Sequence, residues 1–292
     1  MIEQLIQVVT PIFTIIAVGY IWSLMRQRYE LEFVTSVAIN IGCPCLAFST
    51  LTSLEVKHSL LGQVTLSTLM ALFCFGMIGM IVLKTTRLSF RGYLPPLMFA
   101  NIGNMGMPVC LFAYGKEGLA LAIIVFAVVT IGQFTIAVWL YSGSFSPTGL
   151  FKHPVVISIF ISVFVLISGI KPPEWMFKST KLLGEITIPI MLLTLGVSLQ
   201  RMKVHNIGRS FLLSTVRIGM GFCVGFGVAH LTGLTGIARG VMILQCSMPV
   251  AVFNYLLSER YKRNPGETAE LILVSTIMSF VTLPLILNYL ND

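Results

Sequence analysis

The stretch Asn101-Ile-Gly-Asn-Met-Gly-Met-Pro108 decides the fold, because it places two amides, two glycines and a proline in the middle of an apolar segment. Proline removes a backbone donor and clashes with the preceding helical turn, and glycine adds backbone freedom. The stretch therefore predicts a helix that breaks near Pro108. Inside a bilayer, a broken helix is tolerated only where it is buried in protein or lines a water-filled cavity.

The chain around this stretch has the composition of a protein that lies in a membrane. Of its 292 residues, 56% are hydrophobic and 10% are charged, and the mean hydropathy is +0.91. Soluble domains carry about 25% charged residues. Apolar stretches of the ~20 residues that a spanning helix needs recur along the whole chain. The sequence therefore predicts an all-α polytopic membrane protein in which residues 1–292 form a single membrane transporter unit.

Ten transmembrane segments are predicted, and lysine and arginine in the loops set their orientation. The segments are 5–25, 33–52, 60–83, 93–114, 118–141, 152–170, 181–200, 209–231, 236–257 and 269–289. Loops after odd-numbered segments hold twelve basic residues and the other loops hold six; Arg217, inside a segment, completes the nineteen. This bias places the odd loops in the cytoplasm, so both termini are expected outside the cell (inner) membrane.

The rest of the composition excludes several classes of function. The net charge of +8 is distributed in ones, twos and threes between apolar runs, so no nucleic-acid partner is expected. The six cysteines lie in apolar stretches without metal-ligand spacing and are interpreted as packing residues. No nucleotide-binding loop, zinc pattern or catalytic triad signature is found, so we expect neither an enzyme nor a cofactor or metal.

Matched prolines indicate an internal repeat. Pro44 and Pro108 lie 64 residues apart in segments two and four, and Pro189 and Pro249 lie 60 residues apart in segments seven and nine. Two halves of five segments each enter the membrane from opposite sides, which is a common plan of secondary transporters. The predicted fold is thus ten helices in two inverted five-helix repeats, with broken helices four and nine that cross. The repeats are 1–145 and 150–292.

Segment nine carries a second predicted break, at Gln245-Cys-Ser-Met-Pro249. If the two breaks meet near the midplane, two helix N-termini with partial positive charge point at one place, which suits an anion. Side-chain amides add neutral donors there. The alternative is two structural kinks whose amides bond across helices. The predicted substrate-binding residues are Asn101, Gly103, Asn104, Gly106, Pro108, Gln245, Ser247, Pro249 and Asn254.

Three further residues have two interpretations each. Asn40 either reaches the cavity as a substrate ligand or makes an interhelical hydrogen bond. Arg217, about eight residues into its segment, is interpreted as snorkelling to the cytoplasmic surface; the alternative is that it offsets substrate charge or ties helices together. Glu185 is interpreted as an interfacial carboxylate near Lys181, or as a proton carrier. Glu185 and Arg217 are therefore the candidates for coupling.

The stretch Asn101–Pro108, the following Tyr114-Gly-Lys-Glu-Gly118 and the tail from Ser247-Met-Pro-Val-Ala251 through Thr282-Leu-Pro284 resemble the auxin efflux carrier family. The resemblance covers essentially the whole chain. It implies ten spans with crossing breaks, similar to the fold of the bile-acid:sodium symporters, and substrates such as auxin in plants or malate and malonate in bacteria. The plant carriers have a long hydrophilic loop between spans five and six. This chain has a short one, which favours a compact bacterial member.

The sequence therefore predicts a secondary transporter that moves a small organic anion, a carboxylate, by alternating access. The alternatives are a passive channel or pore, or a sodium-coupled symporter of the bile-acid type. The expected partners are the small organic anion and the lipid bilayer. A proton is the candidate coupling ion, and a homodimer is the candidate assembly.

Overall fold

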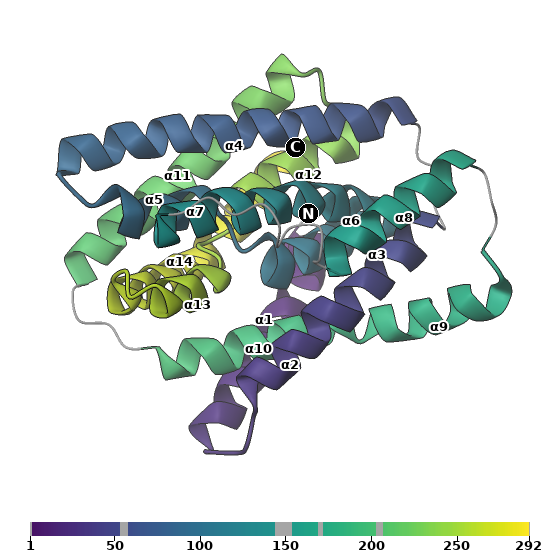
Figure 1. The fold of residues 1–292 in the computed structure, drawn as a ribbon, viewed down its shortest axis with the longest axis horizontal. Coiled ribbons are helices and arrows are strands. Elements are labelled where there is room, and N and C mark those ends of the chain that lie inside the picture. Colours follow the sequence, from purple (N-terminus) through teal and green to yellow (C-terminus); the bar gives the residue numbers. More distant parts are fainter. Residues whose placement is uncertain (1, 53–57, 144–153, 169–171, 203–206, 292) are drawn as a thin grey trace.

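The structure is a computed structural model that describes residues 2–52, 58–143, 154–168, 172–202 and 207–291, and within these ranges it is helical (Figure 1). The α-helices are α1 Ile2–Leu24, α2 Leu31–Val37, α3 Cys43–Thr52, α4 His58–Thr86, α5 Phe90–Met98, α6 Met107–Gly132, α7 Val138–Ser142, α8 Pro154–Ser168, α9 Glu174–Glu185, α10 Thr187–Arg201, α11 Ile207–Leu231, α12 Gly236–Cys246, α13 Phe253–Arg260 and α14 Pro265–Asn291. Three π-helical turns join them: η1 Ala38–Gly42, η2 Ile102–Gly106 and η3 Gln133–Ala137.

Six helical stretches in the described residues are long and apolar enough to cross a membrane, and two shorter apolar helices bring the candidates to eight. The six are Leu31–Thr52, Leu60–Thr86, Ile102–Ser142, Glu174–Arg201, Ile207–Leu231 and Pro265–Leu290; the shorter two are Val9–Leu24 and Gly236–Cys246. The protein is therefore a helical multi-pass membrane protein.

One of these stretches is longer than a single crossing needs. Ile102–Ser142 has 41 residues, which as a straight helix would be about 60 Å long at ~1.5 Å per residue, twice the ~30 Å hydrocarbon core. Its backbone turns at Gly115, whose φ of 63° lies in the left-handed region that favours glycine. The predicted segments 93–114 and 118–141 meet at this turn.

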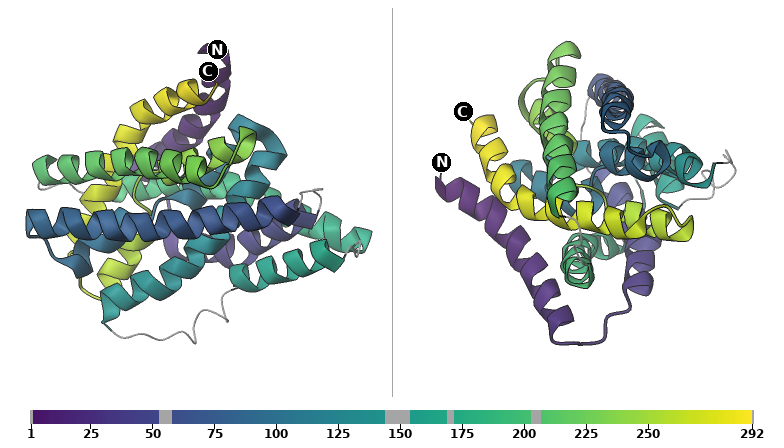
Figure 2. Two further views of the ribbon diagram at one scale, coloured as in Figure 1. Left: turned by 90° about the horizontal axis from the view of Figure 1, so that it is seen from above. Right: turned by 90° about the vertical axis from the view of Figure 1, so that its left-hand side faces the viewer.

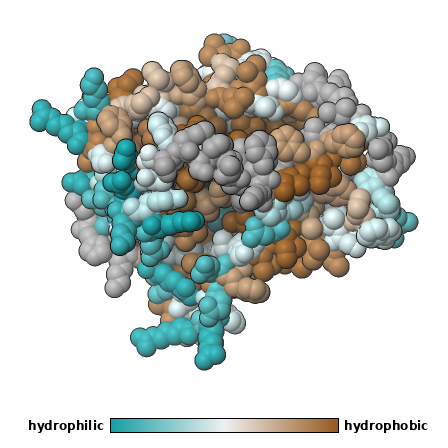
Figure 3. Space-filling model, viewed as in Figure 1, coloured by the Kyte–Doolittle hydropathy of each residue, from teal (hydrophilic) through white to brown (hydrophobic). Residues whose placement is uncertain are grey.

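The surface carries the apolar side chains that lipid requires. On α4, Leu66, Leu69, Phe73 and Ile81 are each more than half exposed. Figure 3 shows hydrophobic surface at the top and on the right of the face in view, whereas hydrophilic side chains gather on the left, where α13 lies, and at the lower turn between α1 and α2. Figure 2 shows the two ends of the chain close together on one side of the molecule.

The first break does not lie near Pro108 as predicted. Helix α5 ends at Met98, residues 99–101 are non-helical, and the next helical stretch begins with η2. Pro108 is instead the second residue of α6, where the preceding wide turn of η2 accommodates its ring without ending the helix. In the second half, α12 ends at Cys246 and α13 begins at Phe253, so the break does include Pro249.

The two breaks cross as a short antiparallel bridge between Ala100 and Val250. The Asn101 N–H donates to the Pro249 carbonyl at 2.7 Å, and the Ala251 N–H donates to the Phe99 carbonyl at 3.1 Å. Each break thus supplies hydrogen-bond partners for backbone groups that the other leaves without a helical partner, as a membrane interior demands. This crossing positions the candidate site.

Candidate functional site

Several predicted residues meet at the crossing. Asn101, Gln245 and Asn254 are buried, with 4%, 1% and 0% of their surface exposed. The Asn254 Nδ2 donates to the Phe99 carbonyl at 3.1 Å, so α13 holds the C-terminal end of α5 in place. Each of these three amides has one polar atom without a hydrogen-bond partner among the described residues: Asn101 Nδ2, Gln245 Oε1 and Asn254 Oδ1.

Glycines allow the crossing helices to approach closely. A Cβ atom at Gly106 would collide with Oε1 of Gln245, and one at Gly103 would come within 3.0 Å of the Phe126 ring. Gly106 therefore lets the Gln245 amide lie against η2. Ser247 does not extend toward η2, because its hydroxyl donates to the Ile243 carbonyl of its own helix at 2.7 Å.

Arg217 does not snorkel to the surface: its side chain is fully buried, with 0% exposed. It lies about 15 Å along α11 from the helix start, at ~1.5 Å per residue, on the face that packs against α4 and α12. Its Nη1 donates to the Cys246 carbonyl at 3.1 Å, and its guanidinium lies 4.7 Å from the centre of the Phe75 ring. Its Nε and Nη2 have no partner among the described residues.

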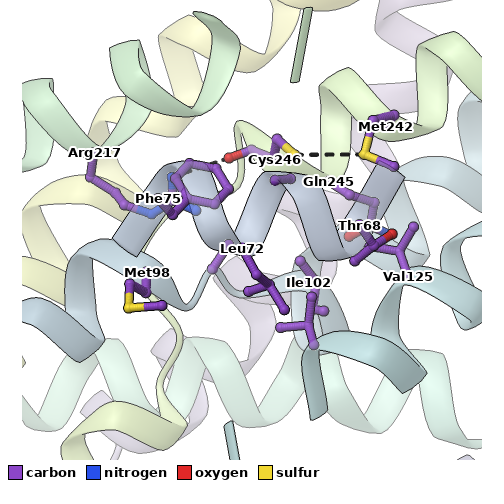
Figure 4. Close-up of a pocket in the computed structure, with 13 residues that line it drawn as sticks. Thr68, Leu72, Phe75, Met98, Ile102, Val125, Arg217, Met242, Gln245 and Cys246 are labelled. Carbon is purple, nitrogen blue, oxygen red and sulfur yellow. Dashed lines mark hydrogen bonds between the residues drawn. The ribbon is translucent and has the colours of Figure 1, made fainter. Parts of the chain in front are cut away.

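Arg217 faces a small cavity beside the crossing (Figure 4). The cavity lies between α4, α6, α11 and α12 and the extended segment at Ala100, and its lining includes Thr68, Phe75 and Gln245. Its free volume is ≈ 20 Å³, which is enough for about one water molecule. Arg217 is the one cationic side chain in a lining that is otherwise apolar or neutral polar, among the residues the structure describes.

The electrostatics at the crossing differ from the two converging positive ends that the sequence suggests. Each break joins a helix C-terminus, which carries partial negative charge, to a helix N-terminus, which carries partial positive charge. At the C-terminal end of α12, Arg217 compensates the negative end through the Cys246 carbonyl. A fixed cation therefore stands beside the helix ends and neutral donors that the sequence predicts.

The structure does not bring every predicted residue to this cavity. Asn104 lies on η2, half-buried, and is not among the cavity residues. Asn40 is exposed on η1 and its Nδ2 donates to the Ser36 hydroxyl at 3.0 Å. Glu185 is also exposed, with its carboxylate 3.8 Å from Lys181 Nζ. The roles of these residues stay predictions.

Sequence reasoning considered Glu185 as the candidate proton carrier and missed a buried acid. Glu270, near the start of α14, is only 2% exposed and accepts a hydrogen bond from the Ser210 hydroxyl at 2.9 Å. It is the second residue of the predicted segment 269–289, so its position in the apolar run was the available signal. Thr68 and Phe75 were missed because α4 carries no break or charge that marks its inner face.

Comparison with known proteins gives the family. The model of the family described as membrane transport protein matches residues 142–287, half of the chain. An uncharacterized transporter of Methanocaldococcus jannaschii is 24% identical over 300 residues, covering 95% of this chain and 96% of the relative. An uncharacterized transporter of Methanothermobacter thermautotrophicus is 24% identical over 296 residues, covering 96% of each chain. The chain is thus a multi-pass transporter of the membrane transport protein family, that of the auxin efflux carriers.

Proposed function

We propose that the protein is a secondary transporter that carries a small organic anion, a carboxylate, across the cell membrane by alternating access. The observation that carries this proposal is the open edge of Arg217 beside the crossing. Nε and Nη2 form one side of the planar guanidinium, and both lack a partner among the described residues. A carboxylate accepts two parallel hydrogen bonds from such an edge. Burying a charge without a counter-charge costs several kcal/mol, and a bound anion would offset that cost.

The inverted-repeat architecture of ten spans is part of the proposal, and two packing relations support it. The bridge pairs Ala100 with Val250, two residues whose numbers differ by 150. The same difference of 150 relates its two hydrogen bonds: Asn101 corresponds to Ala251 as donor, and Pro249 corresponds to Phe99 as acceptor. Helix α1 packs along α10, and the helices that correspond to them in the other half, α8 and α3, also pack along each other. Under this relation Asn104 corresponds to Asn254, whereas Pro108 and Pro249 are not equivalent. The boundary between repeats 1–145 and 150–292 lies outside the described residues.

Alternating access requires movement around the crossing. The cavity holds about one water, so an organic anion fits only when α4 moves away from α11 and α12. The crossing itself is held by backbone hydrogen bonds between the two halves and can remain intact while its surroundings open. We propose both termini outside, on the basic-residue bias of the loops, and proton coupling or uniport as the energy source.

Saturable uptake tests the function against a channel. Proteoliposomes with the purified protein should take up a radiolabelled carboxylate with a rate that saturates, for a panel of acetate, butyrate, malonate, malate and indole-3-acetate. A rate that rises linearly with concentration for every member of the panel would instead indicate a passive pore.

Asn104→Ala is expected to weaken carboxylate binding about ten- to a hundredfold, because a hydrogen bond to a charged group contributes roughly 1.5–3 kcal/mol. Asn104 is half-buried on η2, at the start of the helix that leaves the crossing. Calorimetric titration of the purified variant measures the affinity. Asn40→Ala, on exposed η1, is the control that should bind like the wild type. Equal affinities in both variants would place Asn104 outside the site.

Glu185→Gln is expected to leave the pH dependence of uptake unchanged. The Glu185 carboxylate is exposed beside Lys181, on α9, and does not line the cavity at the crossing. Uptake rates at a series of external pH values, in wild type and variant at matched protein density, measure the effect. A pH profile that flattens in the variant would restore Glu185 as the proton carrier.

A further inference from the structure

The cavity beside the crossing has two chemically different sides. In Figure 4, Arg217 lies on one side, and Gln245 and Thr68 lie toward the other, with Phe75 and Leu72 between them in the view. The Arg217 side offers donors only, from Nε and Nη2. A ligand that binds here once the cavity has opened therefore meets a cationic donor at one end and the groups of α4 and α12 at the other.

The far side offers hydrogen-bond acceptors. Gln245 Oε1 is buried against Gly106 of η2 and has no hydrogen-bond partner among the described residues, whereas its Nε2 is directed at the Cys110 sulfur at 3.6 Å. The Thr68 hydroxyl already donates its hydrogen to the Val64 carbonyl at 2.8 Å, so only its lone pairs remain. A buried acceptor without a donor is costly. One hydroxyl that reaches this side would satisfy Gln245 Oε1, or would donate to the Thr68 oxygen instead.

We propose that the preferred substrate is a hydroxycarboxylate: a monocarboxylate whose hydroxyl is separated from the carboxylate by a short apolar chain. The carboxylate binds the Nε and Nη2 edge of Arg217, and the hydroxyl donates to Gln245 Oε1 or Thr68. This assignment rests on the proposed anion site and adds Gln245 and Thr68 as the residues that determine specificity.

The charges of the lining exclude the closest alternatives. A dicarboxylate would place its second carboxylate against the oxygens of Gln245 and Thr68, where the described lining provides no second cation. An ω-amino acid would place an ammonium there without a carboxylate to compensate it, and burial of an unpaired charge is unfavourable. A neutral donor suits this side, and a hydroxyl is the smallest one.

The spacing between the two sides is held by helices that pack together. Arg217 lies on α11 and Gln245 on α12, and these helices contact each other along their length. The Arg217 Nη1 also binds the carbonyl of Cys246, the residue next to Gln245. When α4 moves to admit a ligand, the donor edge and the Gln245 acceptor therefore keep their separation.

Calorimetric titration with four acids of equal chain length tests the proposal: butyrate, 4-hydroxybutyrate, succinate and 4-aminobutyrate. The wild type is expected to bind 4-hydroxybutyrate at least about tenfold more tightly than butyrate, and the two acids with a second charge more weakly than both. Thr68→Val keeps the shape of the side chain and should reduce the hydroxyl preference. Gln245→Leu should abolish it, so that the ratio of the affinities for 4-hydroxybutyrate and butyrate falls to about one.

The outcomes separate this inference from the function on which it rests. Equal binding of butyrate and 4-hydroxybutyrate that is lost in Arg217→Gln would overturn the hydroxyl assignment and leave the anion site standing. Preference for succinate would overturn it too. A hydroxyl preference that persists in both Thr68→Val and Gln245→Leu would place the acceptor elsewhere. Absence of any Arg217-dependent binding would remove the anion site and the hydroxycarboxylate together.

Discussion

Arg217→Gln is expected to abolish carboxylate binding and transport while the protein still folds. The variant loses the charge and both hydrogen bonds of the open edge, each of which contributes roughly 1.5–3 kcal/mol with a charged partner, so affinity should fall at least about a hundredfold. Arg217→Lys should recover little of the lost carboxylate affinity, because an ammonium keeps the charge but cannot present two parallel donors. Calorimetry for binding and proteoliposome uptake for transport measure the loss.

Stability distinguishes this role from a structural one. If Arg217 served only to hold the end of α12 through the Cys246 carbonyl, removing it would lower the unfolding temperature. An uncompensated buried cation is itself unfavourable, so we expect Arg217→Gln to unfold no earlier than the wild type. Arg239→Gln is the matched control, since Arg239 is exposed and its guanidinium also lies over an aromatic ring, that of Phe226, at 5.5 Å. It should transport normally.

The broken helices show what sequence patterns could and could not predict. Helix breakers in mid-segment predicted that two helices break, and at Pro249 the position was right because proline itself lies in the extended gap. In the first half the position was wrong. The gap at 99–101 is set by its pairing with 249–251, a contact between residues 150 apart, and no local pattern marks it.

Arg217 shows a second limit of the same kind. Its depth in an apolar segment could be read from the sequence, but the direction of its side chain depends on which face of α11 packs against α4 and α12. A single arginine in a span is compatible with snorkelling and with burial. Glu270 was overlooked for the same reason, since its burial comes from packing against Ser210 of another helix.

Pro249→Ala is expected to reduce transport far more than Pro108→Ala. Pro249 lies in the extended segment between α12 and α13, and its carbonyl accepts the Asn101 N–H at 2.7 Å. Alanine favours a helical backbone over proline by about 3 kcal/mol, and it also releases Met248 from the restriction that a following proline imposes. The change should let helix continue from α12 toward α13, which would withdraw the backbone groups that pair with Phe99 and Asn101.

Pro108→Ala should behave differently because its helix is already continuous. Pro108 follows η2 as the second residue of α6. It lies seven residues beyond Asn101, the last residue of the non-helical segment 99–101 that pairs with 249–251. Replacing it removes no break and touches neither hydrogen bond of the bridge. Uptake by the two variants at matched expression measures the difference, with unfolding temperature as the control, since a repaired helix in Pro249→Ala could unfold later than the wild type. If both variants lost transport to the same degree, the two prolines would be functional equivalents after all, and the relation that pairs Asn104 with Asn254 would not describe the working repeat.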